Sequence, residues 1–286
     1  MYCASPSCAV GPSLAVCEQP TGAFSPASFR LPVLARSATL LGLLLQERAL
    51  DLELAASVVA LDPGLAFGVL RLANASYHAP DEPVWQLSSA LVAAGREELC
   101  DLLEHAPRLE ALDDHGRRSR LVELRRRSVV RACVAHLLAR ELGCRNEKKC
   151  FLLGLLFHLS EMAALAHPQA DSREGSGWAP MCDLPVLLGA AKEHGSDVAE
   201  PVLAAVLSAQ ALAVPKRGHS ASELAELPAW HCWPRLSRQQ RCVLLDRCTA
   251  LAVWAETNLD RLEPWDFLSR LERHNPWEKS WTRCGH

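Results

Sequence analysis

A histidine and a glutamate three residues apart offer the clearest candidate chemistry in this sequence. His158 and Glu161 would share one face of a helix, a spacing at which both side chains can bind one metal ion. His136 precedes them and Asp246 follows them on other predicted helices, so the four side chains could form a metal site. The alternative, which we favour, is that His158 makes a hydrogen bond inside a helical core, because histidines and carboxylates at helical spacing are common without a metal.

Arginines are concentrated between residues 117 and 131. Arg120, Arg127 and Arg131 fall near one face of a helix, because steps of seven and four residues complete nearly whole turns. Guanidinium groups match phosphate oxygens, so this helix could bind a phosphate, a nucleotide second messenger or an acidic partner. A commoner explanation of such a run is a solvated helix face, here paired with Glu123. The candidate anion-binding or partner-binding residues are Arg120, Arg125, Arg126, Arg127 and Arg131.

Motifs of other enzyme classes are missing from the sequence. It contains no Walker loop, no Gly-x-Gly-x-x-Gly and no Gly-x-Ser-x-Gly, so nucleotide hydrolysis and the usual serine-hydrolase route lack support. The twelve cysteines include no Cys-x-x-Cys pair, which argues against a zinc site or a disulfide framework. We therefore predict buried free thiols where cysteines occur in apolar helical patterns, at Cys100, Cys133, Cys242 and Cys248. A redox or metal role for Cys3, Cys8 and Cys17 near the N-terminus stays open.

The elements that must position these residues are helices. Alanine and leucine dominate from Pro32 onward, and the alternation of β-branched residues that is typical of strands is absent. Asp51 and the Asp62-Pro63 pair are predicted to begin helices, since Asp caps a helix and proline fits its first turn. Asn146 is a further predicted cap. We expect helices over residues 33–48, 51–61, 62–74, 87–94, 97–105, 119–142, 147–165, 185–194, 198–212, 238–257 and 264–273.

Composition limits the cellular setting and the domain organisation. About half the residues are hydrophobic and the net charge is −3, so the chain is globular and has no overall basic field for nucleic acid. We expect a cytoplasmic protein without a signal peptide or membrane helix, because no uninterrupted apolar run reaches roughly 18 residues. The predicted division is a flexible tail (1–28), an N-terminal helical subdomain (29–110), a second helical subdomain (111–260) and a tryptophan-rich extension (261–286).

Several segments together resemble the HDOD domain (HD-related output domain) of bacterial signalling proteins. The most specific are Asp62-Pro63-Gly64-Leu65-Ala66 and Leu70-Arg71-Leu72-Ala73-Asn74-Ala75-Ser76, followed by Ala90-Leu91-Val92-Ala93-Ala94-Gly95. Weaker matches are Arg127-Ser128-Val129, Gly154-Leu155-Leu156-Phe157-His158-Leu159-Ser160 and Leu187-Leu188-Gly189-Ala190. The resemblance implies an all-α multi-helix bundle with a degenerate HD-like core. We expect architectural roles for Asp62, Pro63, Arg71 and Asn74, with Arg71 pairing with Asp62 or Glu98 and Asn74 bonding the following loop.

The departures from the HD pattern imply that no catalytic centre is present. Active HD phosphohydrolases hold a metal with a His, a His-Asp pair and a further Asp, and the metal activates water. In this sequence the first His position is Arg127, and the His-Asp pair reads Phe157-His158. Phenylalanine cannot bind a metal, and an arginine would repel one. We therefore expect no cofactor and no catalysis.

The resulting prediction is a regulatory module that acts by binding. The expected partner is another signalling protein, or a small ligand such as a nucleotide second messenger, bound in the groove between the two subdomains. Neither a membrane nor nucleic acid is an expected partner. Two alternatives remain open, namely a metal-dependent phosphohydrolase with substituted ligands and a binder of nucleic acid or nucleotide through the arginine-rich helix.

Overall fold

The protein is helical throughout the part of the chain that can be described. The structure, a computed structural model, describes residues 30–74, 84–141, 147–167 and 237–259. Within these ranges the one extended feature is an isolated bridge between Val33 and Arg108. The predicted all-α fold class is therefore confirmed. The helices are α1 (Ala35–Gln46), α2 (Leu52–Ala60), α3 (Pro63–Ala73), α4 (Leu87–Ala94), α5 (Arg96–His105), the 3₁₀ helix η2 (Leu109–Ala111), α6 (His115–Glu141), α7 (Glu147–Leu155), α8 (Leu159–Ala166) and α13 (Arg238–Asn258).

Two aspartates begin helices as predicted. Asp51 accepts a hydrogen bond from the backbone N–H of Leu54 and caps α2. Asp62 accepts from the N–H groups of Gly64 and Leu65 and caps α3, with Pro63 in the first turn. Asp62 is buried, and its second oxygen also accepts from the N–H of Leu34 at 2.8 Å, just before α1 begins. One carboxylate therefore fixes the starts of two helices.

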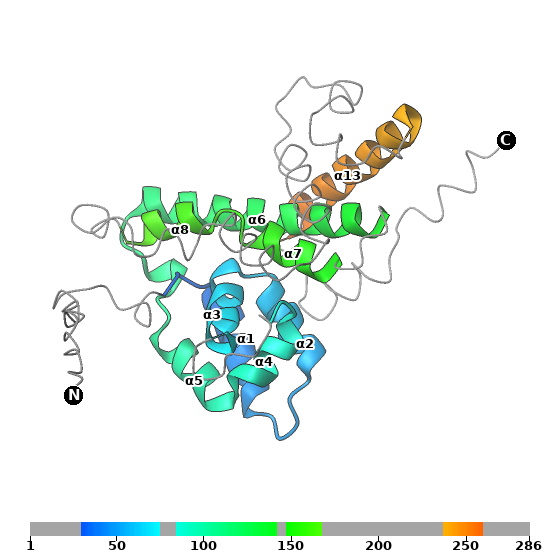
Figure 1. The fold of residues 1–286 in the computed structure, drawn as a ribbon. Coiled ribbons are helices and arrows are strands. Elements are labelled where there is room, and N and C mark those ends of the chain that lie inside the picture. The colour runs from blue at the N-terminus through cyan, green and yellow to red at the C-terminus, as the bar shows by residue number, and fades with distance from the viewer. Residues whose placement is uncertain (1–29, 75–83, 142–146, 168–236, 260–286) are drawn as a thin grey trace, which may run out of the picture.

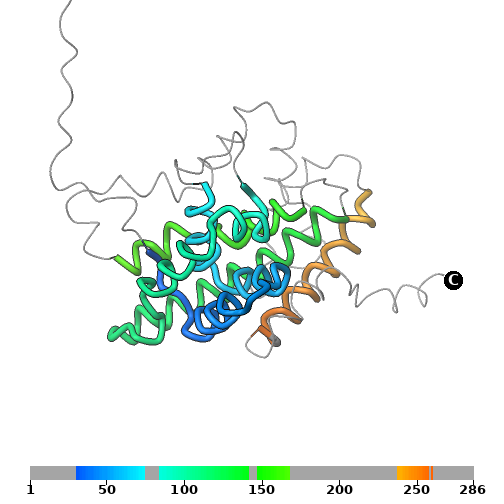
Figure 2. The backbone as a smooth tube through the Cα atoms, turned by 90° about the horizontal axis from the view of Figure 1, so that it is seen from below, coloured from blue at the N-terminus to red at the C-terminus, as the bar shows by residue number. Residues whose placement is uncertain are grey.

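The long helix α6 lies above the group formed by the first five helices in Figure 1. In Figure 1, α1 to α5 form a group below α6 and α7, while α8 lies near one end of α6 and α13 near the other. The view in Figure 2 keeps α13 alongside α6. Helices α6 and α7 approach each other closely at Gly154, where an added Cβ would lie 2.9 Å from the Cα of Ala132. Glycine permits this contact because a larger residue would meet backbone atoms.

Helix α6 begins earlier than predicted. The sequence indicated a start at Ser119 after a polar turn, but the helix begins at His115. Asp114 explains the difference, because its Oδ1 accepts a hydrogen bond from the N–H of Arg117 at 3.0 Å. This is the geometry of an N-terminal cap, so Asp114 begins the helix in a stretch that looks like a loop by composition.

A second prediction was wrong, since the apolar segment 147–165 is not one helix. It breaks into α7 and α8 at a turn over residues 156–158. The N–H of Leu159 donates to the carbonyl of Leu156, three residues back, and the regular pattern resumes when Met162 donates to His158. No glycine or proline marks the break. The break lies where Phe157 and His158 contact α6. We therefore attribute it to tertiary contacts and not to local helix propensity.

The apolar segment also bears on the membrane prediction. By length and composition alone, Glu147–Ala166 would be long enough to cross a membrane, contrary to the sequence reading, but 56% of its most apolar window is buried inside the protein. The core helix of a soluble protein passes the same test, so this is weak support for a membrane helix.

Cysteine predictions hold at some positions and not at others. Cys133 and Cys248 are buried free thiols as predicted, whereas Cys242 is half-buried and Cys100 is exposed. Burial raises the pKa of Cys133 to about 12. A thiol with so high a pKa is unreactive at neutral pH, so Cys133 acts as a small apolar side chain.

Several predictions lie outside the described residues. They concern the tail (1–28), the tryptophan-rich extension (261–286), the cap at Asn146, the segment 187–190 and the helices over 185–194, 198–212 and 264–273. The division into subdomains stays a prediction.

Candidate functional site

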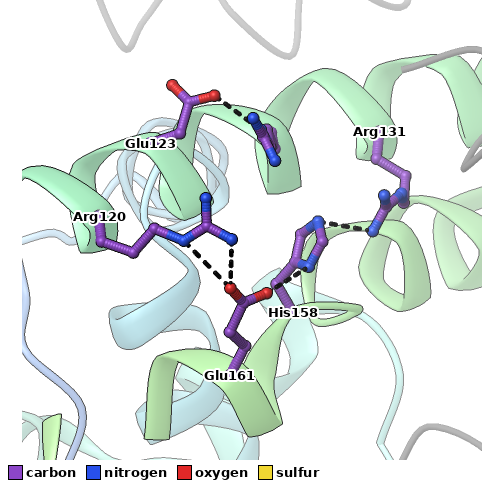
Figure 3. A network of polar contacts seen from close by, with 6 residues as sticks. Arg120, Glu123, Arg131, His158 and Glu161 are labelled. Carbon is purple, nitrogen blue, oxygen red and sulfur yellow. Dashed lines mark hydrogen bonds and ion pairs between the residues drawn. The ribbon is translucent and has the colours of Figure 1, made fainter. Parts of the chain in front are cut away.

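The degenerate HD positions meet where α6 passes the turn between α7 and α8. Helix α6 contributes Arg127 and Arg131, which are four residues apart and so lie on one face. The turn contributes Phe157 and His158, and the first turn of α8 contributes Glu161. Figure 3 shows the polar side chains of this site converging between the two elements.

Arg131 is the centre of the site. Its residue surface is only 1% exposed. Its Nη1 lies 3.0 Å from the Nε2 of His158, and its Cζ lies 4.0 Å from the centroid of the Phe157 ring. The face of an aromatic ring stabilises a cation, so Phe157 partly replaces the water that burial removes.

The charge of Arg131 is nevertheless poorly compensated. Among its contacts in the described ranges there is no carboxylate, and its buried Nε has no hydrogen-bond partner. Burial, and then the neighbouring charge of Arg127, lowers the pKa of Arg131 to about 10. A guanidinium with this pKa is still charged at neutral pH, so the site contains a buried cation.

His158 faces this cation as a neutral imidazole. Burial, then the charges of Arg131, Arg127 and Arg120, lowers the pKa of His158 to about 4, with Glu161 acting in the opposite direction. Because Arg131 has only donors, Nε2 of His158 must accept, and the ring proton is placed on Nδ1. That nitrogen lies 3.6 Å from the Oε2 of Glu161. The imidazole thus connects the buried guanidinium with the half-exposed carboxylate.

Two ion pairs form the outer part of the site. Arg120 places Nη2 at 2.6 Å and Nε at 3.1 Å from the Oε1 of Glu161. Arg127 places Nε at 2.6 Å from the Oε1 of Glu123, one turn earlier on α6. The four side chains are between 34% and 46% exposed, so solvent reaches this layer. The whole network is drawn in Figure 3.

The structure brings together only part of the predicted arginine set. Arg120, Arg127 and Arg131 share the site. Arg125 is buried elsewhere, where its Nε donates to the carbonyl of Leu61 at 3.1 Å and its charge faces Asp62. Arg126 is not among the residues that contact His158 or Glu161. The face predicted from the spacing of Arg120, Arg127 and Arg131 is therefore found, and Arg125 lies outside it.

The four residues considered for a rebuilt metal site do not converge. In the part of the chain that the structure describes, no three His, Cys, Asp or Glu side chains could hold one ion. His158 and Glu161 are neighbours, but His136 packs edge-on against Phe151 with ring centroids 6.4 Å apart, and Asp246 lies on α13. The prediction that His158 bonds within a helical core is correct. Its partner, Arg131, was not foreseen, although the four-residue step from Arg127 gave a signal for it.

The remaining family-motif residues have architectural contacts. Asn74 ends α3 and joins it to the next segment, because its Oδ1 accepts from the N–H of Val84 at 2.7 Å. This confirms the predicted bond to the following loop. The guanidinium of Arg71 lies 5.9 Å from the Phe67 ring. The arginine that faces Asp62 is Arg125 and not Arg71, while the alternative pair of Arg71 with Glu98 stays a prediction.

A separate pocket is lined by α2, the start of α4, α6 and α7. The space enclosed in it is about 50 Å³, which is below the usual range for a small-molecule site. Its walls are mostly apolar, with His136, Ser88 and the charged rim residues Glu53 and Lys148 as polar groups. The position matches the groove that the sequence reading expected between the two halves.

Comparisons with known proteins place the chain in a family. Residues 31–176 match the family model of the HDOD domain, which confirms the resemblance found in the sequence. None of the curated proteins matches the chain. Similar solved structures include two of the MmoQ response regulator from Methylococcus capsulatus str. Bath. One, of fragment 20–298, has a TM-score of 0.41 and 21% identity and covers 90% of this chain and 91% of that chain. The other has a TM-score of 0.40 and 18% identity and covers 90% and 94%.

Proposed function

This chain belongs to the HDOD domain family, and from that membership we propose that it is a regulatory module that acts by binding and catalyses no reaction itself. HDOD domains occur in signalling proteins, which is consistent with a regulatory role. The output would pass through contact with another signalling protein or with a small ligand in the pocket between the two halves.

The observation that carries this proposal is the position of Arg131. In a metal-dependent HD enzyme, imidazole and carboxylate ligands would converge here on a cation. In this chain the site holds a cationic side chain, which lies 3.0 Å from Nε2 of His158 and over the ring of Phe157. The lone pair on Nε2 is used by the guanidinium, and the positive charge opposes a metal ion. The residues at the site therefore favour a pseudo-enzyme.

The arginine-rich helix gives less support to nucleic-acid binding. Such binding needs several lysines or arginines that are free to reach phosphates. Arg125 and Arg131 are both buried, at 8% and 1% exposed, so two of the five candidate arginines cannot reach a nucleic-acid backbone.

A turnover screen tests the proposal. Purified protein would be assayed with Mn²⁺, Mg²⁺ or Fe²⁺ against nucleoside phosphates and cyclic dinucleotides, and we expect no product above the blank. The variants His158→Ala and His105→Ala form a matched pair, because His105 is exposed on α5, away from the site. Metal-dependent turnover that His158→Ala abolishes and His105→Ala preserves would overturn the proposal.

The binding half of the proposal has its own test. A signalling protein captured from the native host by the wild type should be lost with Lys148→Glu at the pocket rim. Glu104→Lys, an exposed reversal on α5, should retain it. Equal capture by all three proteins would show that the partner does not bind at the pocket.

A further inference from the structure

We propose that Arg120, Arg127, Arg131 and His158 form a binding site for a small phosphate-bearing molecule, and that Glu161 occupies part of this site when the ligand is absent. The inference deepens the proposed function, on which it rests, by naming the chemistry of a ligand. It concerns the degenerate HD site and not the pocket between the halves.

The charges of the site leave a positive excess. Three guanidinium groups face two carboxylates, Glu123 and Glu161, and the most buried of the three, Arg131, contacts neither in the described part of the chain. A buried charge without a partner is costly, and an anion brought near it recovers part of that cost. The unsatisfied Nε of Arg131 is a second sign that the site is incomplete.

The lowered pKa of His158 also indicates a positive electrostatic potential at this site. All three arginines lower its pKa, which means that each places positive potential at the ring. As a neutral ring that accepts from Arg131, His158 presents its Nδ1–H to the outer side. This proton is available to an anion in the place where Glu161 now lies, 3.6 Å away.

The outer groups are accessible to a ligand. The side chains of Arg120 and Glu161 are 46% and 42% exposed, and that of Arg127 is 34% exposed. An arriving anion would contact Arg120, Arg127 and Nδ1 of His158 once Glu161 turns away. Arg131 is too buried to be touched and would act from behind, through its charge and by holding the imidazole.

A phosphate monoester fits this site better than a carboxylate does. Glu161 uses one oxygen for Arg120 and directs the other to His158, and it does not reach Arg127, whose partner is Glu123. A phosphate has three terminal oxygens and nearly two negative charges at neutral pH. It could therefore serve all three donors together, and guanidinium forks suit its geometry. Exchange of Glu161 for phosphate would raise the negative charge beside Arg131.

Calorimetry and thermal unfolding with inorganic phosphate at pH 7.5 test the inference, with sodium chloride at equal ionic strength as the reference. For the full chain we expect saturable binding and a rise in Tm that chloride does not reproduce. Arg120→Gln and Arg127→Gln should each weaken binding at least about tenfold, because each removes a charge-assisted hydrogen bond to the anion. Arg117→Gln, on the same helix but paired with Asp114, should bind like the wild type.

The variant Glu161→Gln makes the sharpest prediction. If Glu161 competes with the ligand, its neutralisation should strengthen phosphate binding several-fold, although it removes an ion pair of the native protein. Circular dichroism would establish that each variant is folded. The same titration with AMP distinguishes two kinds of ligand. Tighter binding of AMP than of phosphate indicates a nucleotide, whereas equal binding indicates that only the phosphate group is recognised. Both outcomes support the site.

Two results would overturn the inference. One is the absence of binding beyond the effect of chloride, and the other is binding that Glu161→Gln leaves unchanged or weakens. Neither result touches the proposal that the chain catalyses no reaction, which fails on metal-dependent turnover, or the proposal that the pocket binds a partner, which fails if capture is equal for all three proteins.

Discussion

At the scale of the residue, the site shows how a cation can be buried with little help from carboxylates. Arg131 rests on the ring of Phe157 and bonds to a histidine that is itself kept neutral. The contact with His158 depends on its neutral state, since a protonated His158 would repel Arg131 and could not accept its hydrogen bond. The protonation state of one ring therefore decides whether the arrangement is stable.

Because the contact with Arg131 needs a neutral His158, the stability of the folded protein should depend on pH through the protonation of this histidine. Its pKa is near 6.5 in the unfolded chain and about 4 in the folded protein, so between these values the unfolded state binds the extra proton. The stability that depends on the neutral ring is present above pH 6.5 and is lost as the pH falls toward 4. One such proton changes the free energy of unfolding by at most about 1.4 kcal/mol per pH unit. Urea unfolding at pH 7, 6 and 5 measures this.

The matched variant for that measurement is His158→Gln, which can still accept a bond from Arg131 but cannot be protonated. The wild type should lose more stability between pH 7 and 5 than the variant does. In NMR spectra, the ring signal that the variant lacks should remain that of a neutral imidazole at pH 5.5. Parallel pH profiles, or a ring that titrates near pH 6.5, would show that His158 is not held neutral.

At the scale of the element, the site depends on how closely α7 approaches α6. The residue that sets this distance is Gly154, whose position would place a Cβ 2.9 Å from the Cα of Ala132 and 3.1 Å from the carbonyl of Arg131. Backbone atoms cannot rotate out of the way as a side chain can. The helices must therefore separate if anything larger than hydrogen is placed there, and Phe157, which follows α7, would move with them.

We expect Gly154→Ala to destabilise the protein by about 1–3 kcal/mol through this overpacking. Gly42→Ala is the matched control, because Gly42 lies in α1 and its nearest neighbour would be Leu103 Cδ1 at 3.8 Å. There the substitution should stabilise the protein by about 0.5–1 kcal/mol, the usual advantage of alanine in a helix. Chemical denaturation of both variants provides the comparison, and similar changes in both would mean that the α6–α7 contact is not tight.

The two capping aspartates provide a second matched pair. Asp51→Ala should cost about 1 kcal/mol, because it removes one exposed cap. Asp62→Ala should cost about 3 kcal/mol, because it also leaves the N–H of Leu34 without its acceptor and Arg125 without the carboxylate that faces it. Denaturant midpoints measure the difference. Equal losses would mean that Asp62 is an ordinary cap and does not join α1 to α3.

The same elements show which features of the fold and of the site could be predicted from the sequence. Helix starts at Asp51 and Asp62 were predictable because a cap depends on residues within one turn. The cap at Asp114 depends on the same local rule but lies in a polar stretch that resembles a loop. The break at residues 156–158 was not predictable, since its contacts with Arg131 come from another helix. Likewise Arg127, Phe157 and His158 were identified from the motif, but the cation that contacts His158 proved to be Arg131.

At the scale of the whole molecule, α6 joins parts that are far apart in the sequence. It contacts α3, the turn after α7, and α13, which lies about a hundred residues further along the chain. The attachment of α13 includes an ion pair in which Nη1 of Arg247 lies 2.6 Å from Oε2 of Glu141. Both side chains are largely buried, at 14% and 28% exposed. This pair should therefore contribute more than an exposed one does.

The last prediction concerns that attachment. Glu141→Gln removes the carboxylate charge while keeping the side-chain volume, so it should weaken the packing of α13 without disturbing α1 to α5. We expect amide hydrogen exchange in α13 to become about tenfold faster, which corresponds to about 1.4 kcal/mol of local stability. Glu123→Gln, also on α6 but in a more exposed pair with Arg127, should leave α13 exchange unchanged. If Glu141→Gln instead accelerated exchange in all helices equally, the protein would open as a single cooperative unit, and α13 would have no separate stability for this ion pair to control.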